Sequence, residues 1–292
     1  MLTACPLPAS PAAPAGPESR RLSVPGERVG WLLARPRTCT GVWTGTTRRP
    51  CPSAAAVKAD TADAQCAACA RADKGRQIAR DAAPDDGREY LLYLAWFGPG
   101  LVKVGLTAAG RGRDRLLEQG AISFAVLAAG PYGPVRHAEK TVSSAGLAAE
   151  RVTAKAKAAA WLGLPPPRER AQALAAVRDK VADTICWPAG IQPRPGAVVD
   201  QVRDFGLSTP LPGDWREVTA ISDGAVLAGT IRAVIGRRAL LDTADGPLLC
   251  DMRRAAGWTI RPVPAGLTPA GLTLAASPDP GGADAHVQQA FF

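Results

Sequence analysis

The sequence predicts an α+β protein with an N-terminal four-cysteine module, a three-stranded α/β core, a helical segment and a small C-terminal β barrel or sandwich. Three observations predict this class. Four of the seven cysteines stand between residues 39 and 69, and two short apolar runs joined by a Gly-Pro-Gly turn follow near residue 100. A series of short runs separated by Asp-Gly turns fills the last third. The 292 residues suffice for two or three small domains.

Changes in composition divide the chain into six segments. The first residues and the last ones are rich in Pro, Ala and Gly and offer little to bury, which is typical of disorder. We expect a disordered leader (1–26), a cysteine zinc module (27–74), the α/β core (88–147), a helical segment (148–197), a small all-β module (198–265) and a disordered tail (266–292).

The net charge indicates the class of binding partner, and the cysteine content indicates the cellular compartment. The formal net charge is +9 and the pI near 9.5, which indicates an anionic partner such as DNA or RNA, although coding bias toward arginine would produce the same sum. The basic residues do cluster, because residues 31–59 carry five cations and no carboxylate. No stretch approaches the ~20 apolar residues of a membrane span. We expect a cytoplasmic protein with reduced thiols, no membrane partner and no small-molecule cofactor.

The cysteines Cys39, Cys51, Cys66 and Cys69 follow the pattern C-x11-C-x14-C-x2-C. Two cysteines separated by two residues can turn both sulfurs to one side of a tight turn, at the ~2.3 Å Zn–S distance of a tetrahedral site. We therefore predict a structural zinc ion held by these four thiolates. The alternatives are four unrelated thiols or a redox pair at Cys66 and Cys69, which would prefer a thioredoxin-like strand-to-helix context. Cys186 and Cys250 stand in apolar surroundings and are expected to be core residues.

The α/β core is predicted because two apolar runs typical of strands are followed by residues that recur at helical spacing. Two apolar runs, Tyr90–Ala95 and Leu101–Thr107, flank the turn Gly98–Gly100 and predict a β-hairpin. Arg111, Arg115, Leu116 and Gln119 then recur at helical spacing. A third strand and a further helix follow, over Ile122–Ala128 and Pro134–Leu147.

At these residues the sequence resembles the GIY-YIG nuclease family, in which two strands carry tripeptide motifs, the next helix carries an arginine and a later helix a glutamate. Leu91-Leu92-Tyr93 stands at the first tripeptide and Lys103-Val104-Gly105 at the second, with Thr107 after it. Arg113 falls eight residues after Gly105, and Glu139 follows the third strand. The sequence departs from the family in three places. Lys103 replaces the second tyrosine, Leu91 replaces the first glycine, and the His or Tyr often found one turn after the arginine has no counterpart in Leu116-Leu117.

The resemblance implies a phosphodiester site built from Tyr93, Lys103, Arg113 and Glu139. Glu139 would hold a Mg²⁺ or Mn²⁺ ion, and Arg113 would clamp a phosphate oxygen. Lys103 would neutralise the same phosphate. Tyr93 would be the base or would position water, and its reference pKa of ~10 makes it a poor base unless a cation lowers it.

Each of these residues also has a structural interpretation. Tyr93 suits an ordinary strand, Arg113 belongs to a group of three arginines, and Glu139 can pair with Arg136 or Lys140 on its own helix. The sequence therefore predicts a zinc-containing nucleic-acid-binding protein, with a divalent-metal-dependent endonuclease as the enzymatic candidate. The alternative is a non-catalytic nucleic-acid-binding or scaffold protein with the same fold.

The last third of the chain predicts a run of hairpins. Its four short runs are separated by turn signals that include Asp223-Gly224 and Asp245-Gly246, and a small barrel or sandwich would close them. Taken together, the cysteine group, the core and this β region also resemble a family of uncharacterised proteins that is known only as a domain of unknown function. That resemblance supports the architecture and the zinc site and implies no activity.

Overall fold

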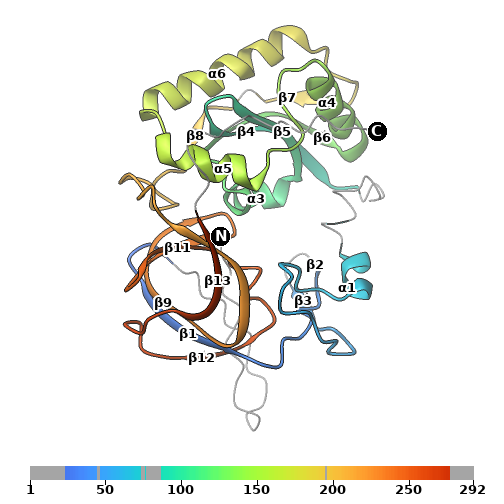
Figure 1. Cartoon of the computed structure of the whole chain (residues 1–292). Coiled ribbons are helices and arrows are strands. Elements are labelled where there is room, and N and C mark those ends of the chain that lie inside the picture. Colours follow the sequence, from blue (N-terminus) through green and yellow to red (C-terminus); the bar gives the residue numbers. More distant parts are fainter. Residues whose placement is uncertain (1–23, 45–46, 74–75, 77–86, 195, 277–292) are drawn as a thin grey trace. The chain divides into compact units, whose positions relative to one another are not determined.

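The computed structural model divides the chain into two compact units (Figure 1). Unit 1 combines residues 1–84 with 214–277, and unit 2 comprises 85–213 with 278–292. The structure describes residues 24–44, 47–73, 76, 87–194 and 196–276. Most of the predicted leader, and the predicted tail from residue 277 onward, lie outside the described residues. Both units mix strands with few helices, in agreement with the predicted α+β class.

Unit 2 is built on an antiparallel sheet whose central strand is β4 (Glu89–Gly98). It pairs on one side with β5 (Leu101–Ala108) and on the other with β6 (Ser123–Pro131). Two short strands, β7 (Gln192–Pro193) and β8 (Val199–Asp200), cover the remaining edge of β6. The predicted hairpin and third strand are confirmed.

The register of the hairpin fixes which side chains share a face of the sheet. Tyr93 pairs with Gly105, and Ala95 pairs with Lys103. Because side chains alternate along a strand and cross-strand partners point to the same face, Tyr93 and Lys103 project from one face. The turn depends on Gly100, whose φ of +70° is a left-handed conformation that favours glycine.

Among its described residues, unit 2 also contains four α-helices. They are α3 (Gly112–Gln119), α4 (Tyr132–Ser144), α5 (Ala154–Ala160) and α6 (Pro167–Thr184). Helix α3 ends at Gly120, which takes the left-handed C-cap conformation. Helix α5 begins at Thr153, whose side-chain oxygen accepts a hydrogen bond from the Ala156 amide at 3.1 Å. The Tyr93 face of the sheet packs Ala95 and Phe97 against Leu116 of α3 and against α5.

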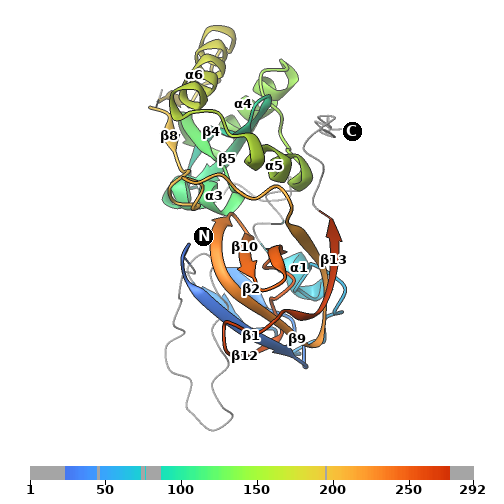
Figure 2. The same cartoon turned by 60° about the vertical axis from the view of Figure 1, so that its left-hand side comes forward.

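Unit 1 is built on a six-stranded sheet in which β9 (Arg216–Ile235) pairs with four of the other five strands. Its first residues pair with β11 (Gly246–Asp251) and β13 (Ala270–Ala276). Its later residues pair with β1 (Arg28–Ala34) and β10 (Arg238–Thr243), and β12 (Thr259–Pro262) lies beyond β1. Figure 2 shows the strong curvature of β9.

The continuity of β9 corrects a predicted turn. Asp223-Gly224 was expected to reverse the chain between two strands, and instead both residues lie inside one twenty-residue strand. Gly224 alone takes a positive φ, +75°, whereas the tight hairpin turn favoured by Asp-Gly needs positive φ at both central residues. The chain therefore bends there without reversing. Asp245-Gly246 does connect β10 to β11 as predicted.

The predicted barrel or sandwich is not confirmed, because the strands of unit 1 form a sheet in the order β10-β11-β9-β1-β12 with β13 on β9 and without a closed barrel. Two of its strands come from segments assigned elsewhere by the sequence. Strand β1 belongs to the predicted cysteine module, and β13 belongs to the predicted disordered tail. Alternating hydrophobic residues explain both: Val29 and Leu33 of β1 are buried, and Leu272 and Leu274 of β13 pack on the same core.

Arg37 joins the cysteine segment to this sheet. Its side chain is only 4% exposed, and its guanidinium donates to the carbonyls of Thr61 (2.9 Å), Lys58 and Ala256 (3.1 Å). The planar guanidinium of Arg37 therefore links the segment before Cys66 to the loop after β11. None of the helices in the described ranges has the length and apolar character that a membrane crossing requires.

We predict that Arg37→Met destabilises the protein by about 3 kcal/mol, because the substitution removes a buried guanidinium and leaves several partly buried carbonyls without their donor. Urea denaturation followed by tryptophan fluorescence measures the change. Arg35→Met is the matched control, since the Arg35 side chain is 76% exposed and makes one long ion pair with Asp223; its effect should stay below about 0.5 kcal/mol. Equal effects for the two variants would contradict the role assigned to Arg37.

Candidate functional site

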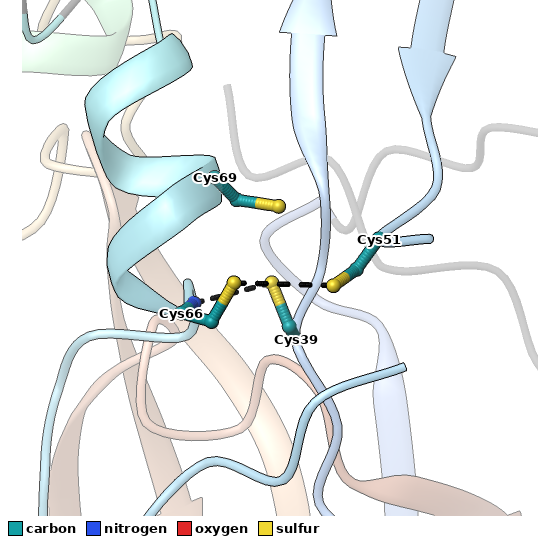
Figure 3. Close-up of side chains that lie close together, drawn as sticks. All are labelled: Cys39, Cys51, Cys66 and Cys69. Atoms are coloured by element: carbon teal, nitrogen blue, oxygen red, sulfur yellow. Dashed lines mark hydrogen bonds between the residues drawn. The ribbon is translucent and has the colours of Figure 1, made fainter. Parts of the chain in front are cut away.

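The four predicted cysteine ligands come together in unit 1. The sulfur atoms of Cys39, Cys51, Cys66 and Cys69 all lie within 4.8 Å of one another, and the four side chains point toward a common centre (Figure 3). The Cys51 and Cys66 sulfurs are 3.9 Å apart. Four thiolates at tetrahedral corners around a metal ion at ~2.3 Å would be separated by about 3.8 Å. The group could therefore hold one metal ion with little rearrangement.

Local structure explains how cysteines from distant positions reach one centre. Cys39 precedes and Cys51 follows the small hairpin of β2 (Val42–Thr44) and β3 (Thr47–Arg49), so the hairpin returns the chain to its starting point. Cys66 is the N-cap of helix α1 (Ala67–Ala72), and Cys69 lies in its first turn. The three-residue spacing places both sulfurs on one side of that turn.

Backbone amides also point at the cluster. The Cys66 amide lies 3.2 Å and the Gly41 amide 3.4 Å from the Cys39 sulfur, and both donate to it. Gly41 has a φ of +74°, and a Cβ there would collide with the Arg49 carbonyl, so only glycine permits this approach. Such N–H groups stabilise negative charge on sulfur, as a metal-bound thiolate requires.

The thiols differ in how readily they ionise. Hydrogen bonds from Ser53 and from the backbone at Ala55 lower the pKa of Cys51 to about 6. Burial raises the pKa of Cys69 to about 12, and its hydrogen bonds to the neighbouring cysteines act in the same direction. A thiol such as Cys69 loses its proton at neutral pH when a cation takes its place, so metal binding at this cluster releases protons.

The six described cysteines are free thiols. Cys250 is fully buried, as expected, and its pKa is raised to about 12 by burial. The expectation for Cys186 was wrong: it lies exposed beyond the end of α6, where the chain leaves the helix.

A second group of predicted residues surrounds Tyr93 in unit 2. The Tyr93 hydroxyl accepts a hydrogen bond from Gln119 Nε2 at 2.7 Å, and the Lys103 ammonium lies 5.7 Å from the centre of the Tyr93 ring. Both polar atoms lie over Gly105. A Cβ at that glycine would be 2.5 Å from the hydroxyl oxygen and 2.6 Å from the ammonium nitrogen, so the absence of a side chain makes room for both. Lys103 Nζ also donates to the Val104 carbonyl at 2.9 Å.

Glu139 lies on α4 and is only 5% exposed. Burial raises the pKa of its carboxyl, while the positive charge of Lys103 and the hydrogen bond from Arg136 oppose that rise. Arg136 Nη1 contacts Glu139 and also lies 3.3 Å from the Glu150 carboxylate. Glu139 is thus paired with Arg136 one turn away on its own helix, which is the structural interpretation given above.

Arg113 does not join these residues. It is half-exposed on α3 and pairs with Asp204 at 2.6 Å. Among the described residues, no hydrogen bond or ion pair connects it to Tyr93, Lys103 or Glu139. The structure therefore brings Tyr93 and Lys103 together, whereas Glu139 is paired with Arg136 and Arg113 with Asp204.

The sequence did not identify two residues of this region. Gln119 was placed on the right helix without a role, because nothing in a helical spacing shows which strand residue it will meet. Glu150 was missed altogether, because its position depends on the chain after α4 returning along β5. There the Val104 amide donates to the Ala149 carbonyl at 2.9 Å.

The family of this protein is identified by sequence comparison. Searches of curated proteins and of solved structures gave no match. The sequence profile of a family described as "Protein of unknown function (DUF2797)" matches residues 43–260, which include Cys51, Cys66 and Cys69 as well as all of the α/β core. This match spans well over half of the chain, and the protein belongs to the DUF2797 family.

Proposed function

We propose that this protein is a zinc-containing nucleic-acid-binding protein whose GIY-YIG-like core holds phosphate beside Lys103. The observation that carries the proposal is the meeting of Tyr93 and Lys103 over Gly105, on the two strands where the family resemblance places its motifs. The chain order of unit 2, hairpin, helix, third strand and helix, supports a GIY-YIG-like core.

The cysteine cluster is proposed to hold zinc in a structural role. Four sulfur ligands with no other donor among them favour zinc over the hard cations Mg²⁺ and Ca²⁺. Since all four positions are filled by protein, no coordination site is left for a substrate. Thiolate ligands also require a reducing compartment, which agrees with the proposed cytoplasmic location.

We predict about one zinc ion per purified chain and its loss in Cys66→Ser, because a three-thiolate site binds zinc more weakly than a closed one. Elemental analysis measures the metal, and thermal unfolding measures the accompanying loss of stability. Cys186→Ser is the matched control, since Cys186 is exposed and far from the cluster in sequence; it should leave both values unchanged. Protein purified without metal, folded and stable, would refute the structural role of zinc.

Phosphate binding at Lys103 is supported by charge and by the state of the ammonium group. Lys103 is half-buried and uses one of its three N–H donors on the Val104 carbonyl. Its remaining N–H groups can donate to an anion. The chain as a whole carries a net charge of +9, which favours association with a polyanion.

We predict that Lys103→Ala weakens binding of the intact protein to a single-stranded oligonucleotide and lowers the slope of log K against log salt by about 1, because one phosphate contact is lost. Fluorescence anisotropy at several salt concentrations measures both. Lys180→Ala removes the same charge from an exposed position on α6 and is the control. An identical slope in the two variants would show that Lys103 makes no phosphate contact.

The second candidate function is phosphodiester hydrolysis with one Mg²⁺ or Mn²⁺ ion at Glu139. The proximity of Lys103 to this buried carboxyl favours it. The ion pair with Arg136 opposes it, because a guanidinium already engages the carboxylate that a metal would need. On present geometry the binding function is therefore the better supported of the two.

We predict that any cleavage of oligonucleotides in Mg²⁺ or Mn²⁺ is abolished by Glu139→Gln while binding is retained, because the variant keeps the shape and loses the metal ligand. Gel analysis of labelled single- and double-stranded substrates measures it, with the exposed Glu89→Gln as control. If the intact protein cleaves nothing in either metal, the hydrolytic candidate fails and the binding function stands.

A further inference from the structure

The hydrogen bond between Gln119 and Tyr93 has a defined direction. Gln119 Nε2 is an amide nitrogen that carries two hydrogens and has no lone pair to offer, so at 2.7 Å it donates and the Tyr93 oxygen accepts. The phenolic proton therefore does not lie on this bond. Lys103, the other polar group over Gly105, is also a donor only. Neither of these two groups can accept the phenolic proton.

The phenolic proton has no acceptor in the part of the chain that the structure describes. The hydrogen bond from Gln119 is the single one that involves the Tyr93 hydroxyl there. A buried hydroxyl normally uses its proton as well as its lone pair. Tyr93 is 1% exposed, so bulk water does not take that proton freely. The hydroxyl is thus prepared to donate to an oxygen atom that arrives beside it.

We propose that Gln119 is the positioning residue of this site, holding Tyr93 as a hydrogen-bond donor to an anionic phosphate oxygen that Lys103 attracts. The identity of the ligand rests on the proposed function; the direction of the hydrogen bond does not. In this arrangement Tyr93 neutralises phosphate charge by donating a hydrogen bond to the phosphate oxygen.

The backbone of Gln119 is held in a way that suits a positioning residue. Gln119 is the last residue of α3, and Gly120 fixes the helix end with a left-handed conformation. The Gln119 carbonyl accepts a hydrogen bond from Lys157 Nζ at 3.0 Å, and that ammonium lies 3.6 Å from the centre of the Phe97 ring. Helix α5 therefore anchors the end of α3 against the sheet, which limits where the Gln119 amide can point.

The half-buried side chains of Lys103 and Gln119 also decide how a ligand reaches Tyr93. Both are long, and each has a polar atom next to the buried hydroxyl. A phosphate that draws Lys103 Nζ away from the Val104 carbonyl uncovers the hydroxyl, whereas Gln119 is retained by its hydrogen bond. Lys103 therefore attracts the anion first, and Tyr93 donates to it afterward.

The test compares Gln119→Glu with Gln119→Met in the full-length protein. The first variant keeps the shape of glutamine but can only accept, so it captures the phenolic proton; the second offers neither donor nor acceptor. Inorganic phosphate binding is measured by calorimetry. We expect Gln119→Glu and Tyr93→Phe each to weaken binding by roughly 10-fold, because a hydrogen bond to a charged oxygen is lost, and Gln119→Met to weaken it less. Tyr132→Phe removes a hydroxyl from α4 and should leave binding unchanged.

A double-mutant cycle separates hydrogen-bond direction from added charge. If Gln119→Glu acts through the Tyr93 proton, it has a much smaller effect when Tyr93 is already phenylalanine. If its effect is equally large in both backgrounds, the introduced negative charge alone repels phosphate and the proposal is overturned. A Tyr93→Phe variant that binds phosphate like the wild type overturns it as well.

A readout without ligand decides the direction of the hydrogen bond separately from the proposed function. The chain has three tyrosines, so labelling with ¹³Cζ-tyrosine gives three resonances, of which Tyr93 is assigned from Tyr93→Phe. Gln119→Glu should move the Tyr93 resonance and leave those of Tyr90 and Tyr132 in place, because the hydroxyl changes from acceptor to donor. An unmoved resonance overturns the role of Gln119. Failure of the wild type to bind phosphate or oligonucleotide removes the proposed function and Tyr93 as a phosphate donor, whatever the resonance shows.

Discussion

The convergence of four sulfur atoms is the constraint on which the N-terminal part of unit 1 depends. Among the described side chains, the cluster formed by the cysteines includes Val42, with Ala55 and Val57 packed against it. A cluster of this size offsets only part of the entropy of ordering the loops between residues 39 and 69. A metal ion held by the four sulfurs would crosslink β2–β3 to α1, and Arg37 joins this segment to the six-stranded sheet.

In unit 2 the corresponding constraint is the pairing of Tyr93 with Gly105. Because glycine leaves space on the sheet, a phenol and an ammonium occupy the same small volume, and the helix that ends at Gln119 decides how the phenol is oriented. The same compactness explains why binding is better supported than hydrolysis. Tyr93 and Glu139 are both buried, and Gln119 and Arg136 already engage their polar atoms. A substrate has to displace side chains before it can react.

Much of the local structure could be predicted from sequence, because it depends on short-range patterns. Alternating apolar residues predicted β4, β5 and β6, and Cys-x2-Cys predicted a shared centre for Cys66 and Cys69. The errors came where local preference and long-range pairing disagree. Asp223-Gly224 favours a turn, but continuous pairing of β9 with strands on both sides overrides it. Strand β13 was assigned to disorder because its own residues are small, and its stability comes from β9.

By itself the sequence determined which residues could carry chemistry: four thiols at ligand spacing, and a tyrosine, a lysine, an arginine and a glutamate on four different elements. These candidates follow from residue type and from the side-chain repeat along the chain, which is two residues in a strand and three to four in a helix. Both repeats describe only a single strand or helical turn. Only the tertiary structure decided which of them meet. Arg113 turned to Asp204, Glu139 to Arg136 and Glu150, and Tyr93 to Gln119, because each partner lies on a segment whose approach is set by packing of the whole unit and leaves no trace in local spacing.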